Sequence, residues 1–288
     1  MHVATVKYAL EIPSSVENAY KKLEKICKAT KEADFLILPE YAGLEWVWLY
    51  KKNFYENVEI FQNSGLENYK KSLLELARNY NQIIIGGTLP VQDTQYYNRC
   101  YIAYPCGELK WQDKINLTPS EQSLGWLKCS NTINVFNSDF GDFSVCICYD
   151  SEFPELASKA VFAGANVIFI PSYTDSKHGA YRVQIAARAR AMENQCFTIT
   201  STCEGKVNCD EFDGIAIGNA GIFTPVDNGF PEDGILEITE NNFMASAVLD
   251  IDHLRKIRLT GQVRNFENRI NFQPIFMKFH GASPVALR

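Results

Sequence analysis

Short, uninterrupted apolar segments that alternate with helix-length amphipathic segments are the feature of this sequence that most restricts its fold. Uninterrupted apolar strands indicate burial on both faces, or a place in the middle of a layered sandwich. We expect strands at residues 1–10, 34–38, 82–87, 99–104, 132–136, 143–148, 167–170, 197–201 and 245–249. We expect helices at residues 14–31, 66–80, 155–163 and 181–195. The strand–helix alternation over the first two-thirds of the chain predicts an α/β fold.

The length of 288 residues lies near the upper limit for one hydrophobic core, so one large domain or two small ones are possible. Because the sequence has no low-complexity linker, charge run or repeat of solenoid period, one domain over residues 1–288 is the simpler prediction. From about Leu259 onward the sequence lacks clear periodicity, which predicts a C-terminal arm over the body or over a partner.

Charge and cysteine content limit the partners and the compartment. The formal net charge of −6 and the pI of about 5.4 argue against a nucleic-acid partner. The longest apolar runs, such as residues 167–171, are too short to span a bilayer. The start MHVATVKYAL lacks the basic residues and long apolar run of a signal peptide, and the nine cysteines are an odd number. These features predict a reduced cytoplasmic protein whose cysteines are mostly buried, among them Cys27, Cys100, Cys146, Cys196 and Cys203.

Cys148 lies where an apolar strand meets a helix. Residues 149–153 form a short turn, and Pro154 suits the first turn of the next helix. A thiol at such a junction can be exposed at the end of a sheet, and the helix N-terminus that follows favours the thiolate. The alternative is a buried packing cysteine, which is what we expect of Cys146, deeper on the same strand face. A Cys-x-Cys metal pair lacks a second ligand pair with zinc spacing.

Three further residues could take part in catalysis with Cys148. Glu40 follows Pro39 at the carboxyl end of the 34–38 strand, where sites in α/β sheets collect, and could act as a general base. Lys114 and Glu121 lie in a polar segment in which Pro119 is expected to prevent a regular helix. Lys114 could stabilise an oxyanion. Taken one at a time, a solvated loop glutamate and a surface lysine are the simpler interpretations.

Histidine is the usual base for a cysteine nucleophile, but no histidine here has a supporting context. The sequence contains His2, His178, His253 and His280. This weakens a Cys–His interpretation and favours a carboxylate as the base.

The combined pattern resembles the nitrilase superfamily of carbon–nitrogen hydrolases. The order Glu40, Lys114, Cys148 matches the Glu–Lys–Cys triad of that superfamily, and Glu121 matches an additional active-site glutamate. LPEY (residues 38–41), DKINLTPSE (113–121) and CICYDSEFPELA (146–157) look like the three motifs around those residues. ANVIFIPSYTD (165–175) and residues 181–201 resemble the strand and long helix that follow.

The resemblance implies a four-layer αββα sandwich that assembles into homodimers or larger homo-oligomers through the helices flanking the cysteine motif. It also implies hydrolysis of a small linear amide, ω-amide or carbamoyl compound through a cysteine thioester, with no metal or organic cofactor. The backbone N–H of Tyr149 would help to bind the oxyanion. Residues in or beside the motifs are candidates for the substrate pocket: Tyr41, Ser172, Tyr173 and Thr174.

Two departures from the family pattern leave the substrate open. Glu152 stands where many members have arginine, in a form similar to an arm of the superfamily often fused behind an acetyltransferase domain. Residues 122–130 (QSLGWLKCS) also lack the pattern of well-characterised amidases. The alternatives are an acyltransferase on the same fold, which passes the acyl group to an amine, and a non-catalytic binding member.

Overall fold

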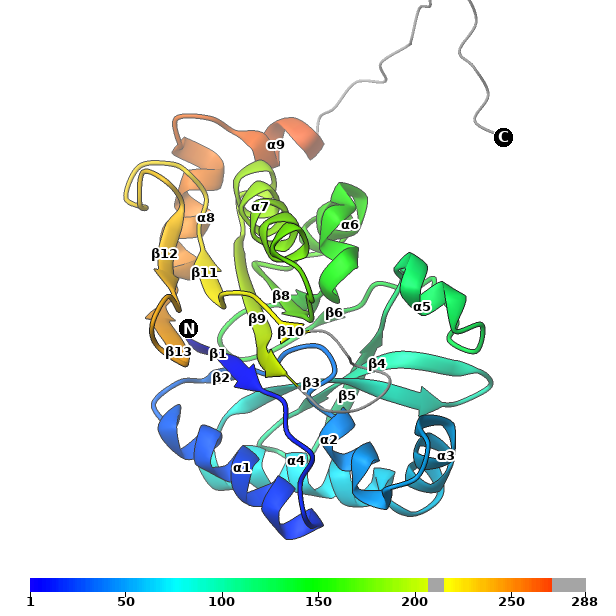
Figure 1. Cartoon of the computed structure of the whole chain (residues 1–288). Coiled ribbons are helices and arrows are strands. Elements are labelled where there is room, and N and C mark those ends of the chain that lie inside the picture. Colours follow the sequence, from blue (N-terminus) through cyan, green and yellow to red (C-terminus); the bar gives the residue numbers. More distant parts are fainter. Residues whose placement is uncertain (207–214, 271–288) are drawn as a thin grey trace, which may run out of the picture.

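The fold is built on one curled β-sheet with helices on its two outer faces (Figure 1), as seen in a computed structural model that describes residues 1–206 and 215–270. The strands are β1 (His2–Ala9), β2 (Phe35–Ile37), β3 (Ile83–Gln92), β4 (Tyr96–Ala103), β5 (Leu109–Asp113), β6 (Val135–Phe136), β7 (Phe143–Val145), β8 (Val167–Ser172), β9 (Phe197–Lys206), β10 (Ile215–Ala216), β11 (Gly221–Phe223), β12 (Ile235–Ile238) and β13 (Met244–Val248). The α-helices are α1 (Val16–Ala29), α2 (Leu44–Val47), α3 (Phe54–Ser64), α4 (Leu66–Tyr80), α5 (Pro119–Ser123), α6 (Pro154–Phe162), α7 (Lys177–Asn194), α8 (Ile251–Thr260) and α9 (Asn265–Ile270). Two 3₁₀ segments are η1 (Trp48–Tyr50) and η2 (Cys148–Glu152).

The strand order is β5-β4-β3-β2-β1-β9-β8-β7-β6, so the first strand of the chain lies at the centre of the sheet. β1 pairs in parallel with β2 on one side and with β9 on the other. The sheet turns at this seam, and its two halves face each other across a shared core. The remaining strands branch from the two central strands: β13 pairs with β1, β10 and β11 pair with β9, and β12 pairs with β11.

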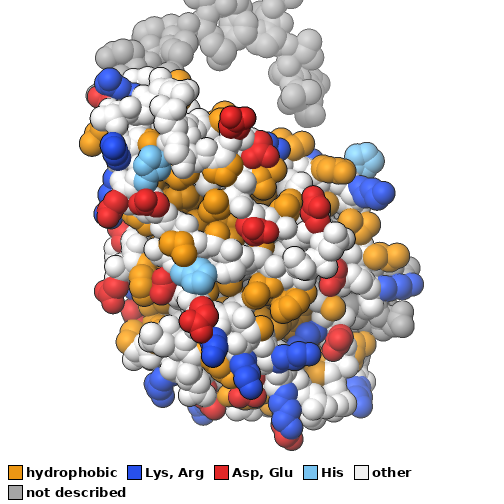
Figure 2. Space-filling model, turned by 90° about the vertical axis from the view of Figure 1, so that its left-hand side faces the viewer, with side chains coloured by type: hydrophobic (Ala, Val, Ile, Leu, Met, Phe, Trp, Pro, Cys, Tyr) orange, Lys and Arg blue, Asp and Glu red, His pale blue; other side chains and the backbone are white. Residues whose placement is uncertain are grey.

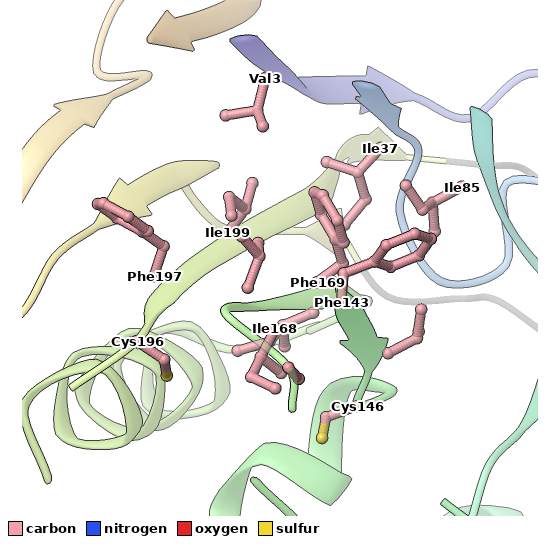
Figure 3. Packing of buried hydrophobic residues seen from close by; sticks show 14 of the residues in the cluster. Val3, Ile37, Ile85, Phe143, Cys146, Ile168, Phe169, Cys196, Phe197 and Ile199 are labelled. Atoms are coloured by element: carbon pink, nitrogen blue, oxygen red, sulfur yellow. The ribbon is translucent and has the colours of Figure 1, made fainter. Parts of the chain in front are cut away.

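Aromatic and aliphatic side chains from both halves of the sheet form the central core (Figure 3). Phe35 of β2 stacks on Phe169 of β8 with ring centroids 5.4 Å apart, and it meets Phe143 of β7 edge-on at 5.2 Å. All three side chains are fully buried. Burial of each ring stabilises the fold by about 2–3 kcal/mol, because its apolar surface is removed from water.

Strand alternation directs every second side chain outward to the helices. Leu36 of β2 joins a second core beneath α1–α4, although its neighbours Phe35 and Ile37 belong to the central core. On the other half, α6 and α7 cover the outer face, and Thr198 of β9 donates a hydrogen bond to the Ala187 carbonyl of α7 at 2.9 Å. The predicted α/β fold with four layers, αββα, is confirmed.

Local signals explain where the elements agree with the predictions. α4 spans the predicted residues 66–80, and Ser15 caps α1 by accepting a hydrogen bond from Asn18 N. α7 begins four residues earlier than predicted because Ser176 caps it through Gly179 N. The prediction that Pro119 prevents a helix is wrong. Pro119 occupies the first turn of α5, where proline fits without loss of a hydrogen bond.

The described part of the expected C-terminal arm is helical and packs on the body. Leu259 lies within α8, and α9 follows it. The Phe266 ring lies 6.4 Å from that of Phe162 on α6, and the Arg258 guanidinium lies 4.4 Å from the centre of the Phe266 ring. Residues 271–288 lie outside the described residues, and a single domain remains a prediction.

The surface shown in Figure 2 carries acidic and basic side chains interspersed among apolar ones. In the part of the chain that the structure describes, no helix is both long enough and apolar enough to cross a membrane.

Candidate active site

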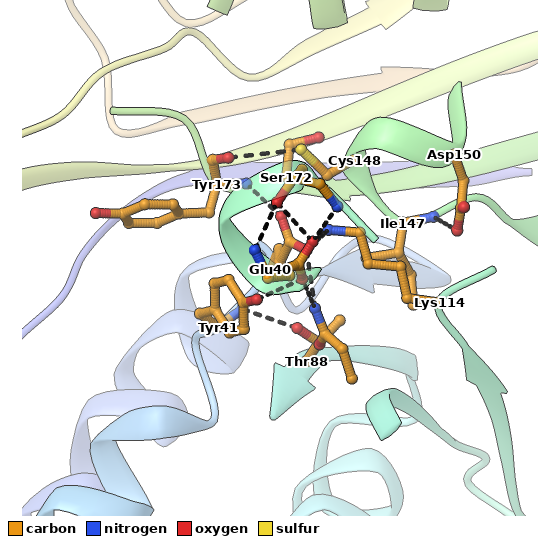
Figure 4. Close-up of polar contacts among 12 residues, drawn as sticks. Glu40, Tyr41, Thr88, Lys114, Ile147, Cys148, Asp150, Ser172 and Tyr173 are labelled. Atoms are coloured by element: carbon orange, nitrogen blue, oxygen red, sulfur yellow. Dashed lines mark hydrogen bonds and ion pairs between the residues drawn. The ribbon is translucent and has the colours of Figure 1, made fainter. Parts of the chain in front are cut away.

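Glu40, Lys114, Glu121 and Cys148 come together at the wall of one cavity of about 770 Å³, although the first and the last are 108 positions apart in the sequence. They arrive from four separate segments: the loop after β2, the residue after β5, the short helix α5 and the start of η2. Figure 4 labels Glu40, Lys114 and Cys148. The structure therefore brings together all four residues that the sequence predicts as the catalytic set.

Glu40 lies in the loop after β2 with its side chain almost fully buried. Its Oε1 atom accepts hydrogen bonds from Lys114 Nζ at 2.7 Å and Asn98 Nδ2 at 3.0 Å, and its Oε2 atom accepts one from Tyr173 N at 3.1 Å. The neighbouring strand β3 comes close to this loop at Gly87, where φ is +73° and an added Cβ would lie 2.3 Å from the Pro39 carbonyl oxygen. Glycine is thus required for the loop to reach this position.

Lys114 connects the two carboxylates. Its Nζ atom lies 2.7 Å from Glu40 Oε1 and 2.7 Å from Glu121 Oε2, with its own side chain 1% exposed. Burial alone would lower the pKa of Lys114, but the two carboxylates outweigh it and raise that pKa. Lys114 is therefore a fixed buried cation beside the cavity, which excludes the simpler interpretation of a surface lysine.

Glu121 is held by its own helix as well as by Lys114. Thr118 caps α5 by accepting from Glu121 N, and the Glu121 carboxylate accepts in return from Thr118 N at 2.8 Å. Tyr41 Oη donates to the same carboxylate at 2.5 Å, and Asn98 Nδ2 does so at 3.0 Å.

The two glutamates differ in acidity. Burial raises the pKa of Glu40 above its usual value, with Lys114 opposing. For Glu121, burial has the same effect, but Lys114 and the other donors outweigh it and lower the pKa. Glu40 is thus the better proton acceptor, whereas Glu121 stays ionised.

Cys148 starts η2 with φ +47°, a left-handed backbone conformation that is uncommon for a residue with a side chain. Its Sγ atom lies 3.5 Å from the Tyr173 carbonyl oxygen, and its thiol is a hydrogen-bonding partner of the Glu40 carboxylate. Burial, followed by the Glu40 charge, raises the pKa of Cys148, although Lys114 opposes this. Burial in the fold therefore opposes formation of the thiolate, an effect that the local sequence does not reveal. Cys146 is fully buried in the core, as predicted.

The five remaining predicted site residues lie at or beside the cavity. Tyr41, Tyr149, Tyr173 and Thr174 line it, whereas Ser172 is buried at the end of β8 and donates to the Ile170 carbonyl. Tyr173 contacts Glu40 and Cys148 through its backbone, as described above. Tyr149 follows Cys148 in the first turn of η2, where N–H groups have no acceptor within the helix.

Asp150 is a positioning residue that the sequence pattern did not indicate. It is 1% exposed and accepts hydrogen bonds from the backbone N–H groups of Ile115 (3.2 Å), Asn116 (2.7 Å) and Ile147 (3.2 Å). It thus ties the segment after Lys114 to the segment before Cys148. Burial raises the pKa of Asp150 to about 6 despite these donors.

The rest of the cavity lining includes both aromatic and charged side chains. Glu152, which replaces the more usual arginine, pairs with Arg182 at 3.2 Å. The aromatic residues that line the cavity are Tyr41, Phe54, Tyr55, Trp126, Tyr149 and Tyr173. Of the three histidines in residues 1–206 and 215–270, none lines the cavity, and the fourth, His280, lies outside the described residues.

Comparison with known proteins agrees with this geometry. The sequence model of the carbon–nitrogen hydrolase family matches residues 2–236. A probable hydrolase of Bacillus subtilis, YhcX, is 31% identical over 274 residues, 93% of this chain but only 53% of YhcX, so the chain spans about half the length of that relative. The 2-oxoglutaramate amidase of the same organism is 26% identical over 88% of this chain and 97% of its own.

The fold agrees as well. The crystal structure of Saccharomyces cerevisiae Nit3, a member of branch 10 of the nitrilase superfamily, superposes with a TM-score of 0.71 at 22% identity, over 90% of this chain and 93% of Nit3. The family match covers well over half of the chain and includes Glu40, Lys114, Glu121 and Cys148. The chain therefore belongs to the carbon–nitrogen hydrolase family.

Proposed function

We propose that this chain hydrolyses a small linear amide, ω-amide or carbamoyl compound by a thioester mechanism in which Cys148 is the nucleophile. The observation that carries the proposal is the contact of Lys114 Nζ with both Glu40 and Glu121 at 2.7 Å, beside a cavity that Cys148 also lines. A buried Glu–Lys–Glu group beside a thiol supplies a base, a fixed cation and an anchor for that cation. The 2-oxoglutaramate amidase relative supports a linear ω-amide as one member of the substrate class.

Acylation begins with a proton transfer. The Glu40 carboxylate takes the proton from the Cys148 thiol, and Sγ attacks the amide carbon. Lys114 Nζ and the backbone N–H of Tyr149 stabilise the negative charge that develops on the amide oxygen. The carbon–nitrogen bond then breaks, the proton on Glu40 passes to the leaving nitrogen, and a thioester remains on Cys148.

In deacylation Glu40 again accepts a proton first and donates it afterwards. Glu40 accepts a proton from a water molecule, which attacks the thioester carbon while Glu121 holds Lys114 in place. The acid is released, and the proton returns from Glu40 to the Cys148 sulfur. Neither half-reaction changes an oxidation state, and the proton that leaves on the amine is replaced by a proton from water.

The test is ammonia release across a panel of linear amides and carbamoyl compounds, combined with mass spectrometry of the trapped thioester. Cys148→Ala should release no ammonia, and Glu40→Gln should form the thioester slowly even in a single turnover. Thioester formation at the wild-type rate in Glu40→Gln would move the base assignment to Glu121. Product analysis with an added amine distinguishes hydrolysis from acyl transfer, and absence of any thioester would favour a binding protein.

We further propose a reduced cytoplasmic setting and a homo-oligomer that associates through α6 and α7. The eight described cysteines are all free thiols, six of them buried, which supports a reducing compartment. Among the apolar residues of these two helices, Ala160, Ala186 and Ala191 are buried within the chain, whereas Ile185 is 65% exposed. The outer face of α7 also exposes Tyr181 and Met192, which supports association at this face.

A further inference from the structure

Asn98 is a fully buried amide on β4 whose side chain contacts both glutamates of the active site. Its Nδ2 atom lies 3.0 Å from Glu40 Oε1 and 3.0 Å from Glu121 Oε1. An amide nitrogen carries two hydrogens, so one hydrogen is available for each carboxylate. Asn98 therefore connects the same two groups that Lys114 connects, but without adding charge.

The sheet places Asn98 directly beside Lys114. Arg99 pairs with Asp113 in the antiparallel β4–β5 ladder, and the Lys114 N–H donates to the Asn98 carbonyl at 2.9 Å, so the next pair along is Asn98 with Lys114. Residues directly opposite each other on paired strands project from the same face of the sheet. The two donors thus approach the carboxylates from neighbouring positions on one rigid surface.

The other end of the Asn98 amide is unsatisfied. Its Oδ1 atom is buried and has no hydrogen-bond partner among the described residues. Unpaired buried acceptors are rare, because they lose their contact with water and gain nothing in return. Rotation of the amide by half a turn would place this oxygen against two carboxylate oxygens, so the charges of Glu40 and Glu121 fix its orientation. This residue is therefore positioned at some cost to stability, as residues that serve a site often are.

We propose that Asn98 is a positioning residue that holds the Glu40 and Glu121 carboxylates at a fixed separation and favours the ionised form of Glu40 that accepts the Cys148 proton. The inference rests on the proposed role of Glu40 as base. A hydrogen bond donated to a carboxylate stabilises its charged form and so opposes the effect of burial. Because Asn98 is neutral, it provides this stabilisation without competing with Lys114 for the oxyanion.

The experiment uses the full chain with Asn98→Leu, which keeps the branch at Cγ and removes both N–H donors and the unpaired oxygen. The probe is iodoacetamide, and peptide mass spectrometry follows alkylation of Cys148 between pH 5 and pH 9. We expect the acid-side midpoint of alkylation to rise by about one pH unit, the size expected for loss of a hydrogen bond to a charged group. The urea midpoint of unfolding should stay unchanged or rise.

Gln112→Leu is the matched control. Gln112 is a buried amide on the adjacent strand β5, but its hydrogen bonds go to the backbone of Asp113, Thr132 and Asn134, and it does not line the cavity. This variant should lose stability and keep the wild-type alkylation midpoint.

An unchanged alkylation midpoint in Asn98→Leu, with or without a loss of stability, would overturn the positioning role. If Asn98→Leu fails to fold, Asn98→Ser, which keeps one small hydroxyl donor, takes its place under the same criteria. Failure of the proposed function gives a different result: wild-type Cys148 would then react no faster at any pH than the exposed Cys129. That outcome would overturn both assignments together.

Discussion

Replacement of Lys114 by methionine tests whether the buried cation holds the active site together. The change keeps much of the side-chain volume and removes one charge that lies 2.7 Å from each of two carboxylates, with all three side chains at most 7% exposed. Removal of one partner from a buried ion pair costs about 3–5 kcal/mol, because the remaining charge has neither a partner nor water. We therefore expect the free energy of unfolding at pH 7 to fall by about that amount.

The loss of stability in Lys114→Met should also depend on pH. Without Lys114, Glu40 and Glu121 face each other as like charges, so one of them binds a proton in the folded state at a pH where unfolded carboxyls are ionised. A carboxyl whose folded pKa is raised contributes stability below the unfolded pKa and loses it as the pH rises through the folded pKa. The destabilisation should accordingly be largest at pH 8 and smaller at pH 5.

The assay is urea denaturation followed by circular dichroism at pH 5, 6, 7 and 8. Lys70→Met is the control, because Lys70 also lies 2.7 Å from a carboxylate, that of Glu67, but on the surface with side chains 24% and 72% exposed. An exposed pair of this kind should contribute at most about 1 kcal/mol, with little dependence on pH. A Lys114→Met cost as small as that of the control, or one that does not vary with pH, would refute the reasoning.

Three further predictions test other parts of the site and the assembly. Asp150→Asn should cost about 2 kcal/mol and lower kcat, since a charged acceptor of backbone N–H groups is lost. Because the pKa of Asp150 is raised to about 6, part of the acid-side loss of activity below that pH should also disappear in this variant. Gly87→Ala should lower both the urea midpoint and kcat: its Cβ would lie 2.3 Å from the Pro39 oxygen at a φ of +73°. Light scattering should show a wild-type mass above 32.6 kDa and a smaller species for Ile185→Glu; a wild-type monomer would contradict the oligomer.

Much of the fold could be predicted because apolar periodicity directly reports burial. β2, β3 and β8 are buried on both faces and α4 on one, and each was predicted near its observed position. The strands β10, β11 and β12 were not predicted, because they are two to four residues long and, unlike the equally short β2, do not lie in a longer apolar segment. α3 was missed too, although Asn53 caps it through Glu56 N. Likewise, Thr118-x-x-Glu121 is a capping-box pattern, so the start of α5 could have been predicted from the sequence.

The site residues also differ in whether the sequence or only the fold identifies them. Glu40, Lys114, Glu121 and Cys148 are identified by the motifs around them, since each follows or belongs to a recognisable segment. Asn98 has no such context: it is one polar residue in a strand, and its importance depends on register, which places it opposite Lys114. Pairing between strands is a property of the folded sheet, so a single sequence without that pairing gives no reason to choose this asparagine over the others.

The different roles of the two glutamates are likewise decided by the fold, because either one could serve as a base on sequence grounds alone. Glu121 receives donors from Thr118 of its own helix cap and from Tyr41, in addition to the two donors that it shares with Glu40. A carboxylate with that many donors holds its charge and is a poor proton acceptor. Glu40 has fewer competing donors, is more deeply buried and has the Cys148 thiol as its neighbour. The shared Lys114 and Asn98 therefore connect one carboxylate that is kept ionised to another that can take up and return a proton, which is the asymmetry that thioester formation followed by hydrolysis requires.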